Sequence, residues 1–301
     1  MGLYDAGERW CGSGLVALMP TDLPETSPLA SFIASNMPSF VPTSVPSCVL
    51  TSMTTSTSTT TSPASTRPST AAHAIIFDND GTLIDSETLV SAVLSSALGR
   101  VGHVISAREC LAEFLGMNAG MCATRMREIF PAGLEAALGG DYHRWICTDL
   151  FALTKAAART DLRPIPGIPE LLGRLHGRGV PMAVASNAEP EWIAATMSIT
   201  GLGGFFGPHL FSAPKIGRSK PAPDVFLAAA AALGIEPARC IAVEDGIAGT
   251  MAAVSAGMRV IGLVASDHLP EGHAGRLTAA GAGRIAYGVD ELGVALETLM
   301  G

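Results

Sequence analysis

The chain of 301 residues has few charged residues, few aromatic residues and very few lysines. Charged residues make up 15% of the sequence and aromatic residues 5%, and lysine occurs only at Lys155, Lys215 and Lys220. The net charge of −8 predicts no basic surface of the kind that binds nucleic acid. The sequence also lacks an apolar run long enough to cross a bilayer. We therefore expect neither a nucleic-acid partner nor a membrane partner.

The cysteines also lack the spacing that is typical of disulfide frameworks and zinc sites. The six cysteines have no C-x-x-C spacing, so they predict neither a disulfide framework nor a zinc site. Reduced thiols in a cytoplasmic protein are the simplest interpretation. The cysteines are Cys11, Cys48, Cys110, Cys122, Cys147 and Cys240.

Residues 1–72 differ in composition from the rest of the chain. Residues 51–71 are almost entirely Ser, Thr, Pro and Ala, which cannot bury enough apolar surface to fold, so we expect a disordered leader. A secretory signal is not predicted, because a basic start and an apolar stretch are missing. Two interpretations stay open: translation starts downstream, for example at Met53, or the leader is a targeting segment. Four acidic residues argue against a targeting segment: Asp5, Glu8, Asp22 and Glu25.

The most informative stretch follows the leader. A short apolar run, Ile75 to Phe77, predicts a buried strand, and it ends in Asp78-Asn79-Asp80-Gly81. The carboxyl end of such a strand is where open α/β sheets bind ligands. Two neighbouring carboxylates repel each other and suit a hard cation such as Mg²⁺. One aspartate can attack phosphorus while the other acts as acid and base, although the same residues also form ordinary turns.

Three further polar groups follow in an order that favours the catalytic interpretation. The apolar segment 180–185 ends in Ser186 and Asn187, which can hold phosphate oxygens at the start of a helix. Lys220 precedes a helix that begins with proline, and it can neutralise a nucleophile and a phosphate. The apolar segment 240–243 ends in Glu244 and Asp245, which can complete a metal site.

The remaining pattern predicts an α/β fold with a doubly wound parallel sheet and a small inserted helical domain. Strands alternate with helices, which implies a parallel sheet covered on both faces. Right-handed crossovers would bring the strand ends with Asp78, Ser186 and Asp245 to one edge. We expect helices over 86–100, 167–178, 189–200, 221–233 and 246–256, strands over 73–77, 180–185, 209–213, 239–244 and 259–264, a helical block over 106–160, and helices from 265 to the end.

At these motifs the sequence resembles the haloacid dehalogenase superfamily, in its capped sugar-phosphatase and β-phosphoglucomutase-like subgroup. The resemblance rests on FDNDGTLIDSE at 77–87, ASN at 185–187, SKPAPDVF at 219–226 and VEDGIAGTMAAVSAGM at 243–258. It implies that Asp78 is the nucleophile and Asp80 the general acid and base. It further implies that Ser186, Asn187 and Lys220 bind phosphate, and that Mg²⁺ is held by Asp78, Glu244, Asp245 and the backbone carbonyl of Asp80. One departure is Gly246, where relatives often have serine.

The resemblance also implies a domain division. Residues 73–88 and 161–301 would form the α/β catalytic core, and residues 89–160 would form a helical cap over the substrate. Three polar residues of that cap are candidates to contact the leaving group: Asn118, Arg125 and Arg127.

The function implied is hydrolysis of a small phosphorylated metabolite by a Mg²⁺-dependent phosphatase, acting as a monomer. A sugar phosphate such as 6-phosphogluconate is the expected substrate. The first alternative is a β-phosphoglucomutase-like phosphotransferase, but those enzymes have a histidine twelve residues after the nucleophile, where this chain has Val90. The second alternative is a non-catalytic phosphate-binding protein. Haloacid dehalogenases themselves lack the aspartate that stands here as Asp80.

Overall fold

The computed structural model describes residues 73–115, 117, 119–265 and 269–301. The predictions for the leader, residues 1–72, and for Asn118 lie outside these residues. In the part of the chain that the structure describes, no helix combines the length and the apolar character needed to cross a membrane.

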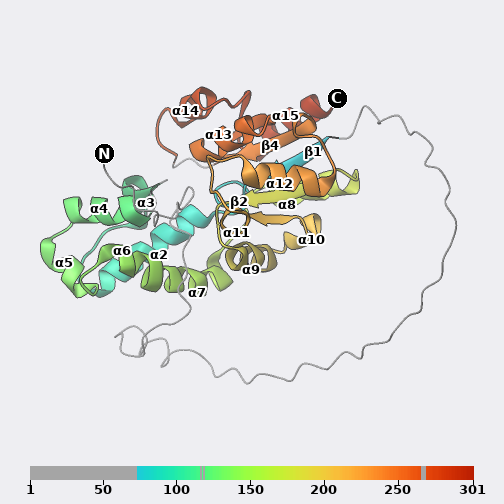
Figure 1. Cartoon of the computed structure of the whole chain (residues 1–301). Coiled ribbons are helices and arrows are strands. Elements are labelled where there is room, and N and C mark those ends of the chain that lie inside the picture. The colour runs from blue at the N-terminus through green and yellow to red at the C-terminus, as the bar shows by residue number, and fades with distance from the viewer. Residues whose placement is uncertain (1–72, 116, 118, 266–268) are drawn as a thin grey trace, which may run out of the picture. The chain divides into compact units, whose positions relative to one another are not determined.

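A parallel sheet of six strands forms the centre of the structure (Figure 1). The strands lie in the order β3-β2-β1-β4-β5-β6, and every neighbouring pair is parallel. Their bounds are β1 Ala74–Phe77, β2 Met182–Ser186, β3 Leu210–Ser212, β4 Cys240–Glu244, β5 Arg259–Val264 and β6 Arg284–Tyr287. The three central strands are buried along their whole length, as expected for a sheet covered on both faces.

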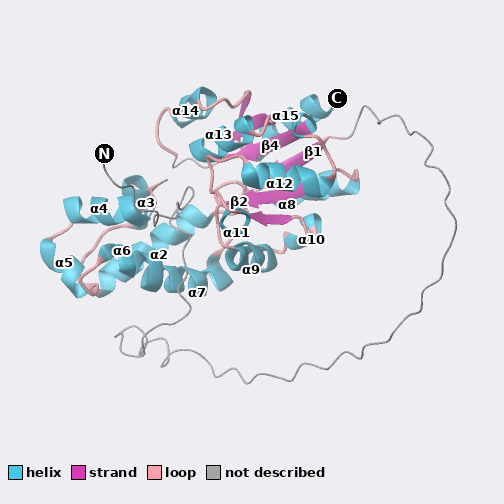
Figure 2. Cartoon of the chain, in the orientation of Figure 1, coloured by secondary structure: helices cyan, strands magenta, loops and turns pink. Residues whose placement is uncertain are grey.

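Helices cover both faces of this sheet (Figure 2). Neighbouring residues of β1 point to opposite faces: Ile75 packs in one apolar cluster with Leu171, and Ile76 in another with Phe226. The helices that follow residue 165 are α8 Ile168–Gly177, α9 Pro190–Thr200, α10 Gly203–Phe206, α11 Ala213–Ile216, α12 Asp224–Leu233, α13 Ile247–Ser255, α14 His273–Ala279 and α15 Val289–Met300, with a 3₁₀ turn at Pro237–Arg239.

A second group of helices, here called the helical part, lies between β1 and α8. It consists of α2 Ser86–Arg100, α3 Ala107–Phe114, α4 Ala119–Ile129, α5 Ala132–Ala137, α6 Tyr142–Trp145, a π-helical turn at Ile146–Leu150, and α7 Phe151–Asp161. It has an apolar cluster of its own that includes Leu98, Phe114 and Met126. The two chain segments that join it to the sheet lie side by side, since the Asp85 N–H donates to the carbonyl of Arg163 at 3.0 Å.

The predicted fold class, a doubly wound parallel sheet, is confirmed. The helix predicted over 86–100 and the strand predicted over 259–264 have those bounds. Helix α12 begins at Asp224, three residues later than predicted. The position before a proline disfavours helical backbone, and Ala222 stands directly before Pro223.

The prediction of only helices after residue 264 was wrong. Strand β6 follows α14 and precedes α15 along the chain, and it forms one edge of the sheet. This edge strand has four residues, of which only Ala286 is buried. Such a strand carries too little apolar alternation to be recognised from sequence.

Candidate active site

The predicted site residues other than Lys220 lie at or just after the ends of three strands that are neighbours in the sheet. Strand β1 pairs with β2 on one side and with β4 on the other, and all three run in the same direction. The Asp78 N–H donates to the carbonyl of Val243 at 2.9 Å, which extends the pairing to the end of β1. The strand ends that carry Asp78, Ser186 and Asp245 therefore lie at one edge of the sheet, as predicted.

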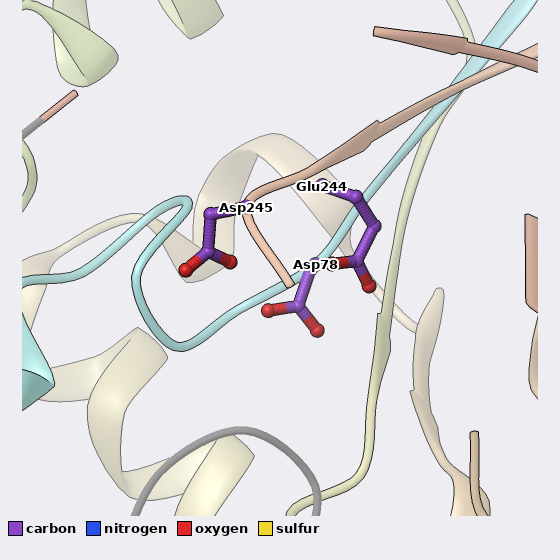
Figure 3. A group of neighbouring side chains, drawn as sticks. All are labelled: Asp78, Glu244 and Asp245. Atoms are coloured by element: carbon purple, nitrogen blue, oxygen red, sulfur yellow. The ribbon is translucent and has the colours of Figure 1, made fainter. Parts of the chain in front are cut away.

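Three carboxylates meet at this edge: Asp78, Glu244 and Asp245 (Figure 3). One oxygen from each lies within 4.8 Å of the others, and the three side chains are at most 9% exposed. Burial, followed by the charges of Asp78 and Glu244, raises the pKa of Asp245 well above its usual value. Carboxylate oxygens whose repulsion is not fully balanced fit a hard cation such as Mg²⁺.

Lys220 contributes the positive charge of the site. Its Nζ donates to Asp78 Oδ1 and, at 2.6 Å, to Glu244 Oε1, and it lies 5.0 Å from the centre of the Phe226 ring. Burial alone would lower the pKa of Lys220, but Asp78 and Glu244 outweigh this effect and raise it. Lys220 is therefore a permanent cation beside Asp78.

The loop around Gly81 fixes Asp245. Gly81 has a φ of +83°, and a Cβ at this position would stand 2.2 Å from Asp245 Oδ2. The hydroxyl of Thr82, the next residue, donates to Asp245 Oδ1 at 3.0 Å. Thr82 lies within the DNDGT run, but this run does not reveal which distant residue the hydroxyl meets, so the role of Thr82 could not be predicted.

Ser186 and Asn187 follow β2 beside Lys220. Ser186 Oγ accepts the N–H of Ala188 at 3.0 Å, and Asn187 Oδ1 accepts the N–H of Lys220 at 2.8 Å. Asn187 therefore holds the Lys220 backbone, a role that the sequence did not suggest. Among the residues that the structure describes, its buried Nδ2 has no hydrogen-bond partner, and the Ser186 hydroxyl, which accepts from Ala188, also has a hydrogen to donate. Both groups are suitable donors to a phosphate oxygen.

Asp80 lies in different surroundings from the three clustered carboxylates. Its Oδ1 accepts the indole N–H of Trp192 at 3.1 Å, and its Oδ2 accepts Asn79 Nδ2 at 3.2 Å. Burial and the nearby charge of Asp78 raise the pKa of Asp80 to about 6, against the opposing effect of its hydrogen-bond donors. A carboxyl group with such a pKa can both give and take a proton near neutral pH. The role of the Asp80 carbonyl as a metal ligand stays a prediction.

Arg125 and Arg127, predicted to face a leaving group, form ion pairs within the helical part. Arg125 pairs with Glu113 at 2.6 Å, and Arg127 pairs with Glu135 at 2.6 Å. Both guanidinium groups thus already have carboxylate partners, and their contact with a substrate stays a prediction.

Comparison with known proteins relates the site to a family. A family model for haloacid dehalogenase-like hydrolases matches residues 72–257, which is more than half of the chain. Hexitol phosphatase A of Escherichia coli is 31% identical over 196 residues, covering 65% of this chain and 84% of that protein. The 6-phosphogluconate phosphatase of Escherichia coli is 28% identical over 195 residues, with the same two coverages, 65% and 84%.

Two solved structures are similar over the described fold. A conserved haloacid dehalogenase-like protein of unknown function from Agrobacterium tumefaciens is 32% identical, with a TM-score of 0.63, and the match covers 76% of this chain and 100% of that one. A hydrolase of the same family from Deinococcus radiodurans, with bound phosphate and sodium, is 29% identical, with a TM-score of 0.64 and coverages of 77% and 97%. The family model, the relatives and the strand-end site agree, and the chain is an enzyme that belongs to the haloacid dehalogenase-like hydrolase family.

Proposed function

We propose that the chain is a Mg²⁺-dependent phosphatase that hydrolyses a small phosphorylated metabolite, with Asp78 as the nucleophile. The observation that carries this proposal is the contact of Asp78 with Lys220 beside the Glu244 and Asp245 carboxylates. A cation in contact with a buried carboxylate, within a cluster that could hold a metal ion, suits in-line attack on a phosphoryl group.

In the first step, an Asp78 oxygen attacks phosphorus and the bond from phosphorus to the leaving oxygen breaks. Asp80 gives its proton to that oxygen, so that the product leaves as an alcohol. Lys220 balances the negative charge that gathers on the phosphoryl oxygens, and Ser186 and Asn187 donate to those oxygens.

In the second step, Asp80 removes a proton from water, and the water oxygen attacks the phosphorus of the aspartyl-phosphate. The bond between phosphorus and the Asp78 oxygen breaks, which releases phosphate and restores the free carboxylate. The pKa of Asp80, about 6, suits a group that is acid in one step and base in the next.

Asp78, Glu244 and Asp245 would hold the Mg²⁺ ion. When bound, it would neutralise charge on the phosphoryl group and on the carboxylates around it. The fit rests on the close approach of three buried carboxylates, for which Lys220 supplies only one positive charge.

We further propose that residues 89–160 act as a cap and that the substrate is a sugar phosphate. The relatives named as hexitol phosphatase and 6-phosphogluconate phosphatase support this substrate class. 6-Phosphogluconate itself is a candidate within that class. The monomeric state, the cytoplasmic location and the lack of a nucleic-acid partner stay predictions from the sequence.

A mutase is disfavoured by the surroundings of Val90, which occupies the position of the histidine of β-phosphoglucomutases. Val90 is 4% exposed and packs in the same apolar cluster as Phe151. A valine in an apolar cluster offers no proton donor for phosphoryl transfer between sugar hydroxyls. A non-catalytic phosphate-binding protein would not need the nucleophile, the acid and the metal carboxylates together, and all of them are present.

The proposal is tested by phosphate release from p-nitrophenyl phosphate with Mg²⁺ and with EDTA, followed by a panel of phosphorylated metabolites. We expect turnover that needs Mg²⁺ and is lost in Asp78→Asn, with a sugar phosphate as the preferred substrate. Turnover by Asp78→Asn at the wild-type rate would exclude Asp78 as the nucleophile. A purified protein with no activity on any phosphate ester would contradict the whole proposal.

A further inference from the structure

Three neutral side chains donate hydrogen bonds to the Asp80 carboxylate: Trp192, Asn79 and Ser86. Trp192 Nε1 donates to Oδ1 at 3.1 Å, and Asn79 Nδ2 donates to Oδ2 at 3.2 Å. Trp192 and Asn79 thus meet different oxygens of the carboxylate. Lys220, by contrast, meets Asp78 with a full positive charge.

Trp192 is rigidly placed. It lies near the start of α9, is 2% exposed, and its ring centre is 6.0 Å from that of Phe151 on α7. A large side chain packed in an apolar cluster cannot rotate without opening a cavity. The indole N–H therefore points at Asp80 in one fixed direction.

Helix α9 supports Asn79 as well. Asn79 Nδ2 also approaches the hydroxyl of Thr196 at 3.4 Å, and this hydroxyl donates to the carbonyl of Ile193 at 3.0 Å. Thr196 is four residues after Trp192 and therefore lies on the same side of the helix. One face of α9 thus fixes Trp192 and Asn79, two of the donors to Asp80.

We propose that Trp192 is a positioning residue that holds the Asp80 carboxyl group in the orientation needed for proton transfer to the leaving oxygen. This inference rests on the proposed phosphatase function. Trp192, Asn79 and Ser86 are all neutral, so they orient the carboxyl group without placing a second fixed positive charge beside it. A purely structural role for Trp192, as a large core side chain, is the competing explanation.

Substrates with different leaving groups distinguish a positioning role of Trp192 from a purely structural one. An alkyl phosphate, such as a sugar phosphate, needs a proton on its leaving oxygen as the phosphorus–oxygen bond breaks, whereas p-nitrophenolate leaves as a stable anion. The ratio kcat/KM covers the reaction up to departure of the leaving group, so it includes the step in which Asp80 acts as acid and leaves out the later step in which it acts as base. Misplacing the Asp80 acid should therefore lower kcat/KM for the alkyl ester and spare the aryl ester.

The test variant is Trp192→Phe, which removes the N–H and keeps an aromatic ring. We expect kcat/KM for the preferred alkyl phosphate to fall about 10- to 100-fold, a part of the usual contribution of general acid catalysis. For p-nitrophenyl phosphate we expect a change of less than about threefold. Equal losses for both substrates, or no loss for either, would overturn the proposal.

The matched control is Trp145→Phe, at a tryptophan that is 5% exposed in the apolar cluster of the helical part. It also replaces a buried indole, so it should lower the melting temperature without changing the ratio between the two substrates. A ratio that changes as much in Trp145→Phe as in Trp192→Phe would assign the effect to packing.

A measurement without turnover tests the contact itself and stands if Trp192→Phe does not fold. The chain has three tryptophans, so a ¹⁵N–¹H spectrum contains three indole signals. In Asp80→Asn, we expect one indole signal to shift, because its acceptor loses the negative charge. If no indole signal shifts, the proposed contact is wrong. If the signal shifts in Asp80→Asn but the wild-type protein has no phosphatase activity, the contact is correct and the proposed function is wrong.

Discussion

Gly249 lies directly against the carboxylate of Glu244. A Cβ at position 249 would stand 1.7 Å from Glu244 Oε1, a distance that no side chain can adopt. Gly249 is in the first turn of α13, just after the strand that carries Glu244. The lack of a side chain at position 249 leaves the space in which Glu244 reaches Lys220.

Gly249→Ala is therefore expected to displace Glu244 and to lower both activity and stability. Activity should fall by at least about 10-fold, and forced packing should cost about 1–3 kcal/mol of unfolding free energy. Phosphate release and urea unfolding measure the two effects. The matched control is Gly173→Ala in α8, where nothing lies within 4 Å of the added Cβ. Because alanine is the better helix former, this control should gain about 0.5–1 kcal/mol. The same sign of stability change in both variants would contradict the steric explanation.

The raised pKa values of the buried carboxylates predict how metal binding depends on pH. Burial and Asp78 raise the pKa of Asp80 to about 6, and burial with its charged neighbours raises that of Asp245. Folded-state values above the unfolded ones stabilise the metal-free protein at low pH, and this contribution is lost as the pH rises through the folded values.

The melting temperature of the metal-free protein should accordingly fall as the pH rises from about 4 through about 6, the pKa of Asp80. Mg²⁺ binds the ionised carboxylates, so the increase in melting temperature that it causes should be larger at the higher pH. Thermal unfolding with EDTA or with Mg²⁺ measures both. Asp245→Asn should flatten the pH dependence and abolish the Mg²⁺ effect. A Mg²⁺ effect that is larger at the lower pH would refute the assignment of the Asp245 carboxylate to the metal.

The central sheet could be predicted because its signals are local. Buried strands that end in Asp78, Ser186 and Glu244 are each visible as an apolar run followed by polar residues, and parallel pairing brings such ends together. Strand β6 was missed because a short edge strand with one buried residue has almost no pattern.

The residues that orient the site could not be predicted. Trp192 and Asp80 are separated by 112 positions, and the spacing of α9 marks Trp192 only as an apolar residue of a helix. The contact between Gly249 and Glu244 is closer in sequence, but it depends on the exact turn from β4 into α13. Local patterns identify which residues have reactive groups, whereas tertiary packing decides what holds those groups in place.

Lys220→Met should abolish catalysis and strengthen the response to metal. The substitution leaves Asp78 and Glu244 without their cation, and breaking a buried ion pair costs about 3–5 kcal/mol. Because the remaining carboxylates then repel each other more, Mg²⁺ should raise the melting temperature more than in the wild type. The control is Lys215→Met, at an exposed lysine of α11, which should behave like the wild type. A smaller Mg²⁺ effect in Lys220→Met would mean that Lys220 helps to assemble the metal site and does not oppose its charge.

A last prediction concerns His273, which anchors the loop of a metal-binding carboxylate. His273 Nε2 lies 2.7 Å from the carbonyl oxygen of Asp245. A carbonyl only accepts, so Nε2 carries the hydrogen, and Nδ1 faces Arg276 at 3.5 Å. The bond joins α14 to the end of β4, between residues that are 28 positions apart.

Removing this anchor in His273→Leu should weaken Mg²⁺ binding by about 10- to 100-fold, as is usual when a group that orients a metal ligand is lost. Calorimetric titration with Mg²⁺ measures the affinity directly, and activity at saturating Mg²⁺ should remain close to that of the wild type. His273→Gln keeps an N–H donor and should retain most of the affinity. His143→Leu, at an exposed histidine of α6, is the matched control and should bind Mg²⁺ normally. Equal affinities in His273→Leu and His143→Leu would mean that Asp245 is held by Thr82 and Gly81 alone.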